Sequence, residues 1–251
     1  VGLKNIFLNC KGAWILGSNR CSRTIWKTME ELNPLQKQVL DFFARSALRE
    51  KFYWTGGTLL SVVYLHHRRS EDLDFFSDSP FSHNDIIGFI RELKEKIGLS
   101  FVEEKKIFDR WEFFLHNQEE VRLEFVHYDH PRIKKQESWN GVSIDSFDDI
   151  ATNKLMALFD RNEPKDIVDL YFLLIKGGYT IETLLQFVEQ KFGVRFAKSA
   201  VWSEAFKSMK DLEAIEPLLL GGTEEEKNQI LKNIKNYFST QSKEFLDREL
   251  E

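Results

Sequence analysis

Apolar positions near the start of the chain recur with a helical period. Every third or fourth residue from Leu35 to Phe43 is apolar, so these side chains would share one face of a helix. The preceding pair Asn33-Pro34 favours the beginning of a helix, because Asn caps the first turn and Pro fits its first position. The pattern therefore predicts an amphipathic helix from residue 35 to about residue 50.

The next part of the chain contains short β-favouring runs, separated by turn residues and by two helical segments. Aromatic and β-branched residues favour strands, and glycines and polar clusters favour turns. On this basis we expect strands over residues 52–55, 73–76, 100–108, 111–115 and 121–128. Helices are expected over residues 58–66 and 82–97. Because short polar turns join the last three strands, we expect these strands to be antiparallel neighbours.

From residue 146 onward the apolar spacing is helical throughout. It predicts helices over residues 147–160, 165–175, 181–192, 196–209 and 224–238. Strands followed by a run of helices indicate an α+β fold. We therefore expect a small mixed or antiparallel sheet with flanking helices in residues 29–146. An all-helical C-terminal bundle would follow in residues 147–251 and complete a cleft beside the sheet.

Residues 1–28 differ from the rest of the chain. They contain five basic residues and no acidic residue, whereas the remaining residues carry an excess of acids. Basic, acid-poor segments are sometimes targeting peptides. The apolar stretches here are short, however, and Met29 directly precedes a well-formed helix start, so translation could begin there. We expect this atypical leader to be either foreign to the native chain or disordered.

Composition narrows the class of protein. Of 251 residues, 42% are apolar and 30% are charged, as in ordinary globular chains, and no run of 18 apolar residues could span a membrane. The net charge of −5 argues against a surface that binds nucleic acid everywhere, although local basic patches are compatible with it. Two cysteines, Cys10 and Cys21, are too few for a disulfide scaffold, which favours a reducing cytoplasmic location.

The most informative motif is Gly56-Gly57-Thr58, followed after thirteen residues by Asp72-Leu73-Asp74. A glycine pair before a helix lets backbone N–H groups approach a phosphate, and the Thr58 hydroxyl can add a contact. Two acids two positions apart on a strand point to one face, so Asp72 and Asp74 can share divalent metal ions. Each half alone is a weak signal. The order of strand, glycine turn, helix, basic loop and acidic strand is much more specific.

Glu124 is the candidate for a third metal-binding carboxylate. It interrupts an apolar strand in which Val121, Leu123 and Phe125 share the opposite face. The alternative is an exposed strand residue on a solvated face, and periodicity alone slightly favours that alternative.

A second group of charged residues lies in the helical half. Lys154 and Arg161 are seven residues apart on one predicted helix, and Asp166 and Asp169 are three residues apart on the next. Such residues usually form a salt-bridge network that holds two helices together. The same arrangement could place a lysine against the oxygens of a triphosphate.

Taken in order, these segments resemble one known family. The resemblance rests on Gly56-Gly57-Thr58, His67-Arg68, Ser70, Asp72-Leu73-Asp74-Phe75-Phe76, Leu123-Glu124-Phe125, Ala151, Lys154-Leu155-Met156-Ala157, Arg161, Lys165-Asp166 and Asp169-Leu170-Tyr171-Phe172-Leu173-Leu174. The chain resembles the AbiEii/AbiGii toxin-like nucleotidyltransferase family, within the DNA polymerase β-like superfamily. The resemblance spans about residues 35 to 176 and does not cover the leader.

The resemblance implies transfer of a nucleotide from an NTP to an acceptor, with Mg²⁺ or Mn²⁺ held by the paired acids. It maps the family's glycine turn, phosphate-contacting lysine and late acid to Gly56 and Gly57, Lys154, and Asp166. Two positions depart from the common pattern. The turn often reads Gly-Ser where this chain has Gly57-Thr58, and the late motif often reads Arg-Asp where this chain has Lys165-Asp166. Both substitutions keep the hydroxyl or the charge.

The sequence and the resemblance together give a set of candidate site residues. The predicted catalytic residues are Asp72, Asp74, Glu124, Lys154 and Asp166. The predicted metal ligands are Asp72, Asp74 and Glu124. The predicted nucleotide-binding residues are Gly56, Gly57, Thr58, Arg68, Ser70, Lys154 and Arg161.

We therefore expect a Mg²⁺-dependent nucleotidyltransferase that moves an NMP from an NTP to an RNA (tRNA) or protein acceptor. Members of this family include toxins paired with a cognate antitoxin as well as isolated genes of unknown role, so the resemblance is compatible with a toxin and its antitoxin but does not decide the biological role. Two local basic groups could receive RNA phosphates: Arg132 with Lys134 and Lys135, and Lys191 with Arg195 and Lys198. One alternative is a non-catalytic nucleotide- or RNA-binding protein of the same fold that acts through a partner. Hydrolysis of a phosphoester is another.

Overall fold

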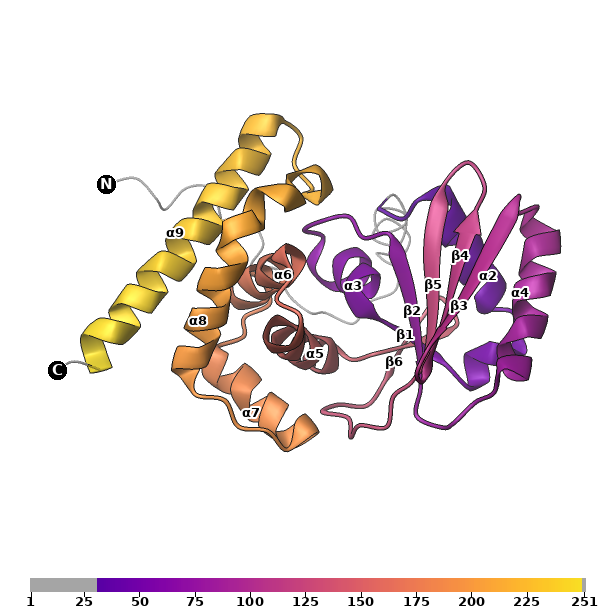
Figure 1. Ribbon diagram of the computed structural model, residues 1–251, viewed down its shortest axis with the longest axis horizontal. Coiled ribbons are helices and arrows are strands. Elements are labelled where there is room, and N and C mark those ends of the chain that lie inside the picture. The colour runs from indigo at the N-terminus through magenta and orange to yellow at the C-terminus, as the bar shows by residue number, and fades with distance from the viewer. Residues whose placement is uncertain (1–30, 250–251) are drawn as a thin grey trace, which may run out of the picture.

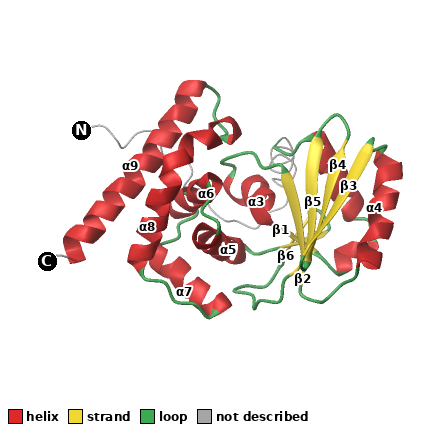
Figure 2. Cartoon of the chain, viewed as in Figure 1, coloured by secondary structure: helices red, strands yellow, loops and turns green. Residues whose placement is uncertain are grey.

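The computed structural model describes residues 31–249, so the predicted leader lies outside the described residues. The strands gather in one part of the molecule, and helices alone form the other part (Figures 1 and 2). This arrangement confirms the predicted α+β fold with a helical C-terminal region. The division into domains at residue 146 stays a prediction.

In the described part of the chain, seven strands form one mixed sheet with the order β3-β4-β5-β2-β1-β7-β6. Their bounds are β1 Tyr53–Thr55, β2 Asp72–Ser77, β3 Phe101–Ile107, β4 Arg110–His116, β5 Glu120–His127, β6 Glu137–Trp139 and β7 Val142–Ile144. β3, β4 and β5 are antiparallel neighbours, as expected. β2 runs antiparallel to β1 and parallel to β5, which places residues 50 positions apart in the chain side by side.

One face of the sheet is covered by α2 (Pro34–Phe43) and α4 (His83–Ile97). Helix α2 begins with a capping box, in which the side chains of Asn33 and Gln36 each accept a hydrogen bond from the other's backbone N–H. The ring of Phe43 stacks on Phe75 of β2 with 4.0 Å between centroids. One part of the hydrophobic core therefore lies between these helices and the apolar face of the sheet, and the core continues through the helical part of the molecule.

The opposite side of the sheet carries the glycine turn. Helix α3 (Gly56–Leu59) starts directly after β1 and continues as a π-helical segment, η2 (Leu60–Leu65). It ends at His66, whose φ of +49° lies in the left-handed region. Figure 1 shows α3 between the sheet and the helices α5 and α6, with α4 beyond the far side of the sheet.

The helical part contains α5 (Phe147–Asp160), α6 (Pro164–Ile175), α7 (Ile181–Phe192), α8 (Lys198–Ser208), η3 (Met209–Leu218) and α9 (Glu224–Glu249). Two backbone hydrogen bonds join it to the loop after η2. The Arg69 N–H donates to the Leu218 carbonyl at 2.6 Å, and the Leu220 N–H donates to the His67 carbonyl at 3.2 Å. These bonds fix the loop that leads into β2 against the helical part.

Several predicted bounds differ from the observed ones. The helix expected over residues 35–50 is α2 followed by a separate 3₁₀ turn, η1 (Ala47–Glu50), because the Ser46 side chain caps a new turn. Strands β6 and β7 were not predicted, since each has only three residues. The last helix extends well beyond residue 238. None of the helices between residues 31 and 249 combines the length and the apolar character needed to cross a membrane.

Candidate active site

Three predicted acids share one face at the centre of the sheet. In the parallel pairing of β2 with β5, Asp74 lies directly opposite Glu124, and Asp72 lies opposite Arg122. Leu73 between the two aspartates points into the core, so Asp72 and Asp74 point to the other face. The aspartates are half-buried and Glu124 is buried. We call Asp72, Asp74 and Glu124 the acid cluster; the strand register brings them together as the sequence predicted.

Arg122 lies within the acid cluster and bonds two of its members. Its Nε and Nη2 atoms donate to the two carboxylate oxygens of Asp72 at 3.1 and 2.6 Å. Its Nη1 atom is 2.8 Å from Oε1 of Glu124. The guanidinium thus joins two neighbouring carboxylates that would otherwise repel each other.

Asp74 is the member of the acid cluster without such a partner. Among residues 31–249 its carboxyl group forms no hydrogen bond and no ion pair within ordinary distances. Burial and the neighbouring charges of Glu124 and Asp72 together raise the pKa of Asp74 to about 7, although the positive charges of Arg122 and Lys154 act to lower it. The carboxyl group is therefore in an environment where burial and negative charge outweigh the positive charges nearby.

Gly56 makes room for the Asp74 carboxylate. A Cβ atom at Gly56 would lie 1.8 Å from Oδ2 of Asp74, and the φ of Gly56 is +83°. Any side chain at this position would therefore collide with the acid and strain the backbone. The requirement for glycine here is a physical consequence of how closely the turn approaches the acid cluster.

The chemistry of the acid cluster suits a divalent cation such as Mg²⁺, which prefers carboxylate oxygens. As arranged, however, no group of three His, Cys, Asp or Glu side chains among the described residues could hold a metal ion. Arg122 uses the oxygens of Asp72 and one oxygen of Glu124. The strand register places the three predicted acids on one face, but their side chains do not converge in this arrangement. Their role as metal ligands stays a prediction.

The second glycine of the turn faces cations instead of acids. A Cβ atom at Gly57 would lie 2.8 Å from Nη2 of Arg68, 3.2 Å from Oγ of Ser70 and 3.6 Å from Nζ of Lys154. We call this position the Gly57 site. Two cationic groups and one hydroxyl therefore converge on a backbone that carries no side chain, and this is a donor set suited to a phosphate.

A buried acid on α6 holds the cations of the Gly57 site. Asp169 accepts from Nε and Nη2 of Arg68 at 2.6 and 2.9 Å, and its Oδ2 lies 2.7 Å from Nζ of Lys154. Nε2 of His67 lies 2.7 Å from Oδ1 of the same carboxylate. We call His67, Arg68, Lys154 and Asp169 the Asp169 cluster; all four residues are buried.

The charges of this cluster explain the ionisation of Asp169. Burial would raise its pKa, but Arg68 and Lys154, together with the hydrogen bonds from Arg68 and His67, hold the pKa well below the usual range. Asp169 is therefore an anion with three partners. The sequence singled it out only as a neighbour of Asp166.

Asp166 and Arg161 form the salt bridge that was the alternative interpretation of this segment. Nε and Nη2 of Arg161 donate to Asp166 at 2.9 and 2.7 Å, and the Glu163 N–H donates to Asp166 at 3.3 Å. Nζ of Lys154 is farther away, at 3.9 Å. These contacts join the end of α5 to the start of α6. The predicted catalytic role of Asp166 and the predicted nucleotide contact of Arg161 stay predictions.

The Thr58 hydroxyl has a structural partner. It donates a hydrogen bond to the backbone carbonyl of Asp72, and the residue is buried. Thr58 thus ties the start of α3 to the strand that carries the aspartates. The predicted contact of Thr58 with the nucleotide stays a prediction.

Sequence reasoning missed the basic residues beside the acids. Arg122 lies two residues before Glu124, so the two share a face, but its pairing with Asp72 depends on the parallel alignment of β2 with β5. Arg110 and Glu112 on β4 extend the same row, since Arg110 lies 3.4 Å from Glu112 and 3.6 Å from Glu124. The one available signal was the Arg-x-Glu spacing on an otherwise apolar strand.

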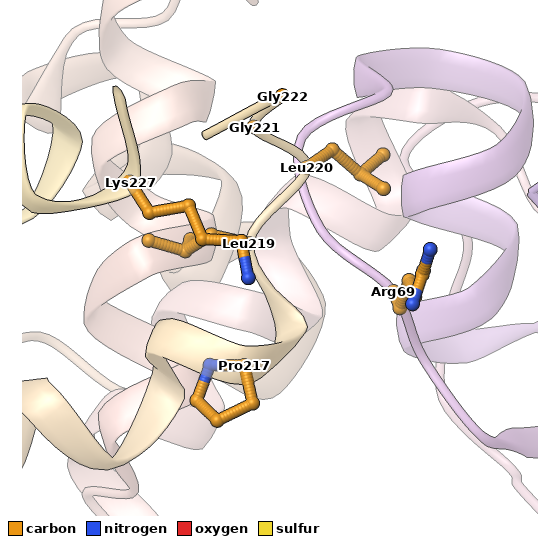
Figure 3. Close-up of a pocket in the computed structure, with 7 residues that line it drawn as sticks. All are labelled: Arg69, Pro217, Leu219, Leu220, Gly221, Gly222 and Lys227. Carbon is orange, nitrogen blue, oxygen red and sulfur yellow. The ribbon is translucent and has the colours of Figure 1, made fainter. Parts of the chain in front are cut away.

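A separate hollow of about 350 Å³ lies beside the loop that carries Arg68 and Ser70. Figure 3 shows Arg69 on this loop facing Pro217–Gly222 and Lys227 of α9 across the hollow. Lys227 is paired with Glu216 at 3.2 Å. None of the predicted site residues lines this hollow.

Known proteins were compared with the chain as a whole. The chain is similar to the uncharacterized protein aq_aa25 of Aquifex aeolicus (strain VF5), with 28% identity over 227 residues. The alignment covers 87% of this chain and the full length of that protein. A crystal structure of a candidate nucleotidyltransferase from H. pylori is similar in fold, with a TM-score of 0.54 and 18% identity, covering 87% of this chain and 97% of that one. The crystal structure of JHP933 from Helicobacter pylori gives a TM-score of 0.47 and 19% identity, covering 90% and 98%.

The family comparison covers most of the described chain. Residues 38–247 match the family described as nucleotidyl transferase AbiEii toxin, Type IV TA system. The match includes the glycine turn, both clusters and most of the helical part, and it extends well beyond the segment in which the motifs were found. The chain belongs to the AbiEii nucleotidyltransferase toxin family.

Proposed function

We propose that the protein transfers an NMP from an NTP to an RNA or protein acceptor in a divalent-metal-dependent reaction. The observation that carries this proposal is the opposite charge on the two sides of the glycine turn. The acid cluster carries three carboxylates against Arg122, whereas the Gly57 site presents Arg68 and Lys154 against Asp169. A metal–triphosphate complex fits this arrangement, because its cation would face the acid cluster and its phosphates would face the Gly57 site.

In this proposal the residues of the turn bind and orient the triphosphate. Backbone N–H groups at Gly57 and the side chains of Arg68, Ser70 and Lys154 contact phosphate oxygens, while Gly56 leaves space for Asp74. The acids belong to the nucleotidyltransferase part, residues 29–146, and Lys154 comes from the helical part, residues 147–251. Lys154 would therefore complete the site from across the boundary between the two parts.

The acid cluster would hold Mg²⁺ or Mn²⁺. When bound, the metal supplies positive charge to the α-phosphate and to the leaving pyrophosphate. The acceptor hydroxyl gives up its proton to solvent, and its oxygen forms a bond to the α-phosphorus. The bond from that phosphorus to the oxygen that bridges to the β-phosphate breaks, and pyrophosphate leaves with that oxygen. Asp72 and Asp74 orient this end of the substrate, and the Gly57 site orients the other end.

An RNA acceptor such as tRNA is supported at one of the two predicted basic patches. Lys134 and Lys135 are exposed and have no carboxylate partner among the described residues. Arg132, the third member of this patch, is paired with Asp78 and Asp145. The other patch is less available, because Lys191 is buried and paired with Asp149. Its other two members are also paired, Arg195 with Glu189 and Lys198 with Glu182. We infer that an RNA backbone would meet the first patch only.

A non-catalytic nucleotide-binding protein is the second candidate function. The observation in its favour is Arg122, which already neutralises part of the acid cluster without any metal. In either case we propose a cytoplasmic toxin that is controlled by an antitoxin. The family description, a toxin of a Type IV TA system, supports the pairing.

Transfer assays distinguish these functions. The full chain is incubated with each α-labelled NTP, Mg²⁺, total RNA and cell extract, and the products are then treated with ribonuclease or protease. Label that is lost with ribonuclease identifies RNA as the acceptor, and label lost with protease identifies a protein. Free labelled NMP indicates hydrolysis, and unchanged NTP for all four nucleotides would contradict the proposal and leave the binding function.

A further inference from the structure

The guanidinium of Arg122 occupies the oxygens that a metal ion in the acid cluster would need. Arg122 donates hydrogen bonds to both carboxylate oxygens of Asp72. Its Nη1 atom also lies 2.8 Å from Oε1 of Glu124. Asp74 alone keeps both oxygens unbonded among the described residues. Any cation that uses all three acids therefore has to displace the side chain of Arg122.

Displacement is physically possible because only the side chain has to move. The backbone of Arg122 is fixed by its pairing with Asp72 across the two central strands. Its side chain, by contrast, is 31% exposed, so the guanidinium can reach solvent by rotation of its own bonds. The strand framework would therefore persist whether the guanidinium or a metal ion lies between the acids.

The cost of displacement depends on what arrives with the metal. A bare divalent cation replaces the guanidinium at the acids but leaves it without an anionic partner, so charge-assisted hydrogen bonds are lost. A metal that arrives with a polyphosphate brings new anionic oxygens to the same place. The displaced guanidinium could then pair with those oxygens, and the lost bonds would be replaced.

We propose that Arg122 is a positioning residue that competes with the divalent cation for Asp72 and Glu124 and so makes metal binding depend on polyphosphate. The inference rests on the proposed function, since it takes the acid cluster as the metal site. In this inference the guanidinium of Arg122 is the internal cation that keeps the three carboxylates together when no substrate is bound. Metal and nucleotide would consequently enter the site as one unit.

Binding of Mn²⁺ to the full chain tests this inference without any measurement of activity. Free Mn²⁺ is measured by electron paramagnetic resonance, with and without inorganic tripolyphosphate. Each titration is corrected by the same titration without protein, because tripolyphosphate itself binds Mn²⁺. In the wild-type protein we expect weak binding of Mn²⁺ alone and at least about tenfold tighter binding when tripolyphosphate is present. In Arg122→Gln, Mn²⁺ alone should bind about tenfold more tightly than in the wild type, and the gain from tripolyphosphate should fall to about threefold or less.

Two further variants separate the bridging contact from general charge. Arg110→Gln removes a nearby cation that lies 3.6 Å from Glu124 and makes no contact with Asp72, so Mn²⁺ affinity should change by less than about threefold. Arg122→Lys keeps the charge but cannot bond both acids with one planar group, so its Mn²⁺ affinity should be intermediate. Equal effects of Arg122→Gln and Arg110→Gln would overturn the inference, because net charge alone would then explain them.

The outcome for the metal site itself is read from Asp72→Asn in the same titration. If Asp72→Asn leaves Mn²⁺ affinity unchanged, the acid cluster is not the metal site and the proposed function loses its basis. If Asp72→Asn abolishes binding while Arg122→Gln binds Mn²⁺ no more tightly than the wild type, only the inference about Arg122 is wrong. Thermal unfolding of each variant establishes that the titrated protein is folded.

Discussion

The acid cluster and the Asp169 cluster lie on the two sides of the glycine turn. They differ in whether the key carboxylate has partners within the protein. Asp169 is fully buried, accepts from two side chains and lies beside the Lys154 ammonium, and its pKa is held low by them. Asp74 is only half-buried, yet its carboxyl group has no hydrogen-bonding partner among residues 31–249, and the pKa of this group is raised to about 7. One carboxylate is satisfied within the protein, and the other is not.

This difference separates a structural role from a functional one. A buried anion with several charged partners stabilises the arrangement of the segments that supply those partners, here the loop after η2 and helices α5 and α6. An acid held near other acids without a partner costs free energy in the absence of a ligand, and such arrangements are concentrated at functional sites. The comparison therefore predicts that substitutions in the two clusters affect different properties.

The largest effect is expected on activity, from Asp74→Asn. The substitution keeps the shape of the side chain but removes the charge that would hold the metal, so transfer should fall by about a thousandfold, as when other positioned charges are removed from active sites. The free energy of unfolding should be unchanged or slightly higher, because the repulsion from Glu124 and Asp72 is lost. Asp109→Asn, an exposed acid in the β3–β4 turn, is the matched control and should leave activity at the wild-type level. Full activity in Asp74→Asn would show that the acid cluster is not catalytic.

The next largest effect is expected on stability, from Asp169→Asn. The buried Arg68 and Lys154 would keep their charges and lose the anion between them, so the free energy of unfolding should fall by about 3–5 kcal/mol. Urea denaturation measures the loss directly. Asp211→Asn, an exposed acid in η3, serves as the control. A loss below about 1 kcal/mol would mean that the Asp169 cluster does not hold the loop and the two helices together.

The sequence predicted one of the two clusters more completely than the other. Asp72 and Asp74 could be placed on one face because side chains in a strand alternate, and the Glu124 strand could be recognised by its apolar pattern. Their partner Arg122 could not, because the pairing depends on β2 lying parallel to β5, and no local pattern specifies which strands become neighbours. Two of the three partners of Asp169, Arg68 and His67, lie 101 and 102 residues away in the chain. Helical spacing could relate Asp169 to Asp166 and Lys154 but could not identify these two distant partners.

A smaller effect on substrate binding is expected from Gly57→Ala. The new methyl group would lie 2.8 Å from Nη2 of Arg68. The Arg68 guanidinium cannot move away freely, because its Nε and Nη2 atoms each donate a hydrogen bond to Asp169. Displacement of the cations at the Gly57 site should raise the KM for the NTP by about tenfold, with a smaller change in kcat. Gly88→Ala in α4 is the matched control: no atom lies within 4 Å of its added methyl group, so KM should not change. An equal KM in both variants would remove the Gly57 site from the proposed binding of phosphate.

The smallest effect is expected on the pH dependence of stability, from His67→Gln. Burial lowers the pKa of His67 below the usual 6.5, and the charges of Arg68 and Lys154 act in the same direction against the raising effect of Asp169. The neutral ring donates from Nε2 to Asp169, while its Nδ1 atom has no partner among the described residues. Below pH 6.5 His67 is therefore protonated in the unfolded chain but stays neutral in the folded protein. The free energy of unfolding consequently falls as the pH falls.

Glutamine keeps an N–H donor for Asp169 and does not titrate, so the variant should lack this contribution. Between pH 6.5 and 5 the wild-type protein should lose up to about 1.4 kcal/mol per pH unit more than His67→Gln, measured by urea denaturation at each pH. The contribution of Asp169 falls in a separate range, since its low pKa makes its stabilisation disappear only below about pH 4. Parallel curves for the two proteins down to pH 5 would mean that His67 is protonated in the folded state, and the Asp169 cluster would then carry one more positive charge than the geometry assigns to it.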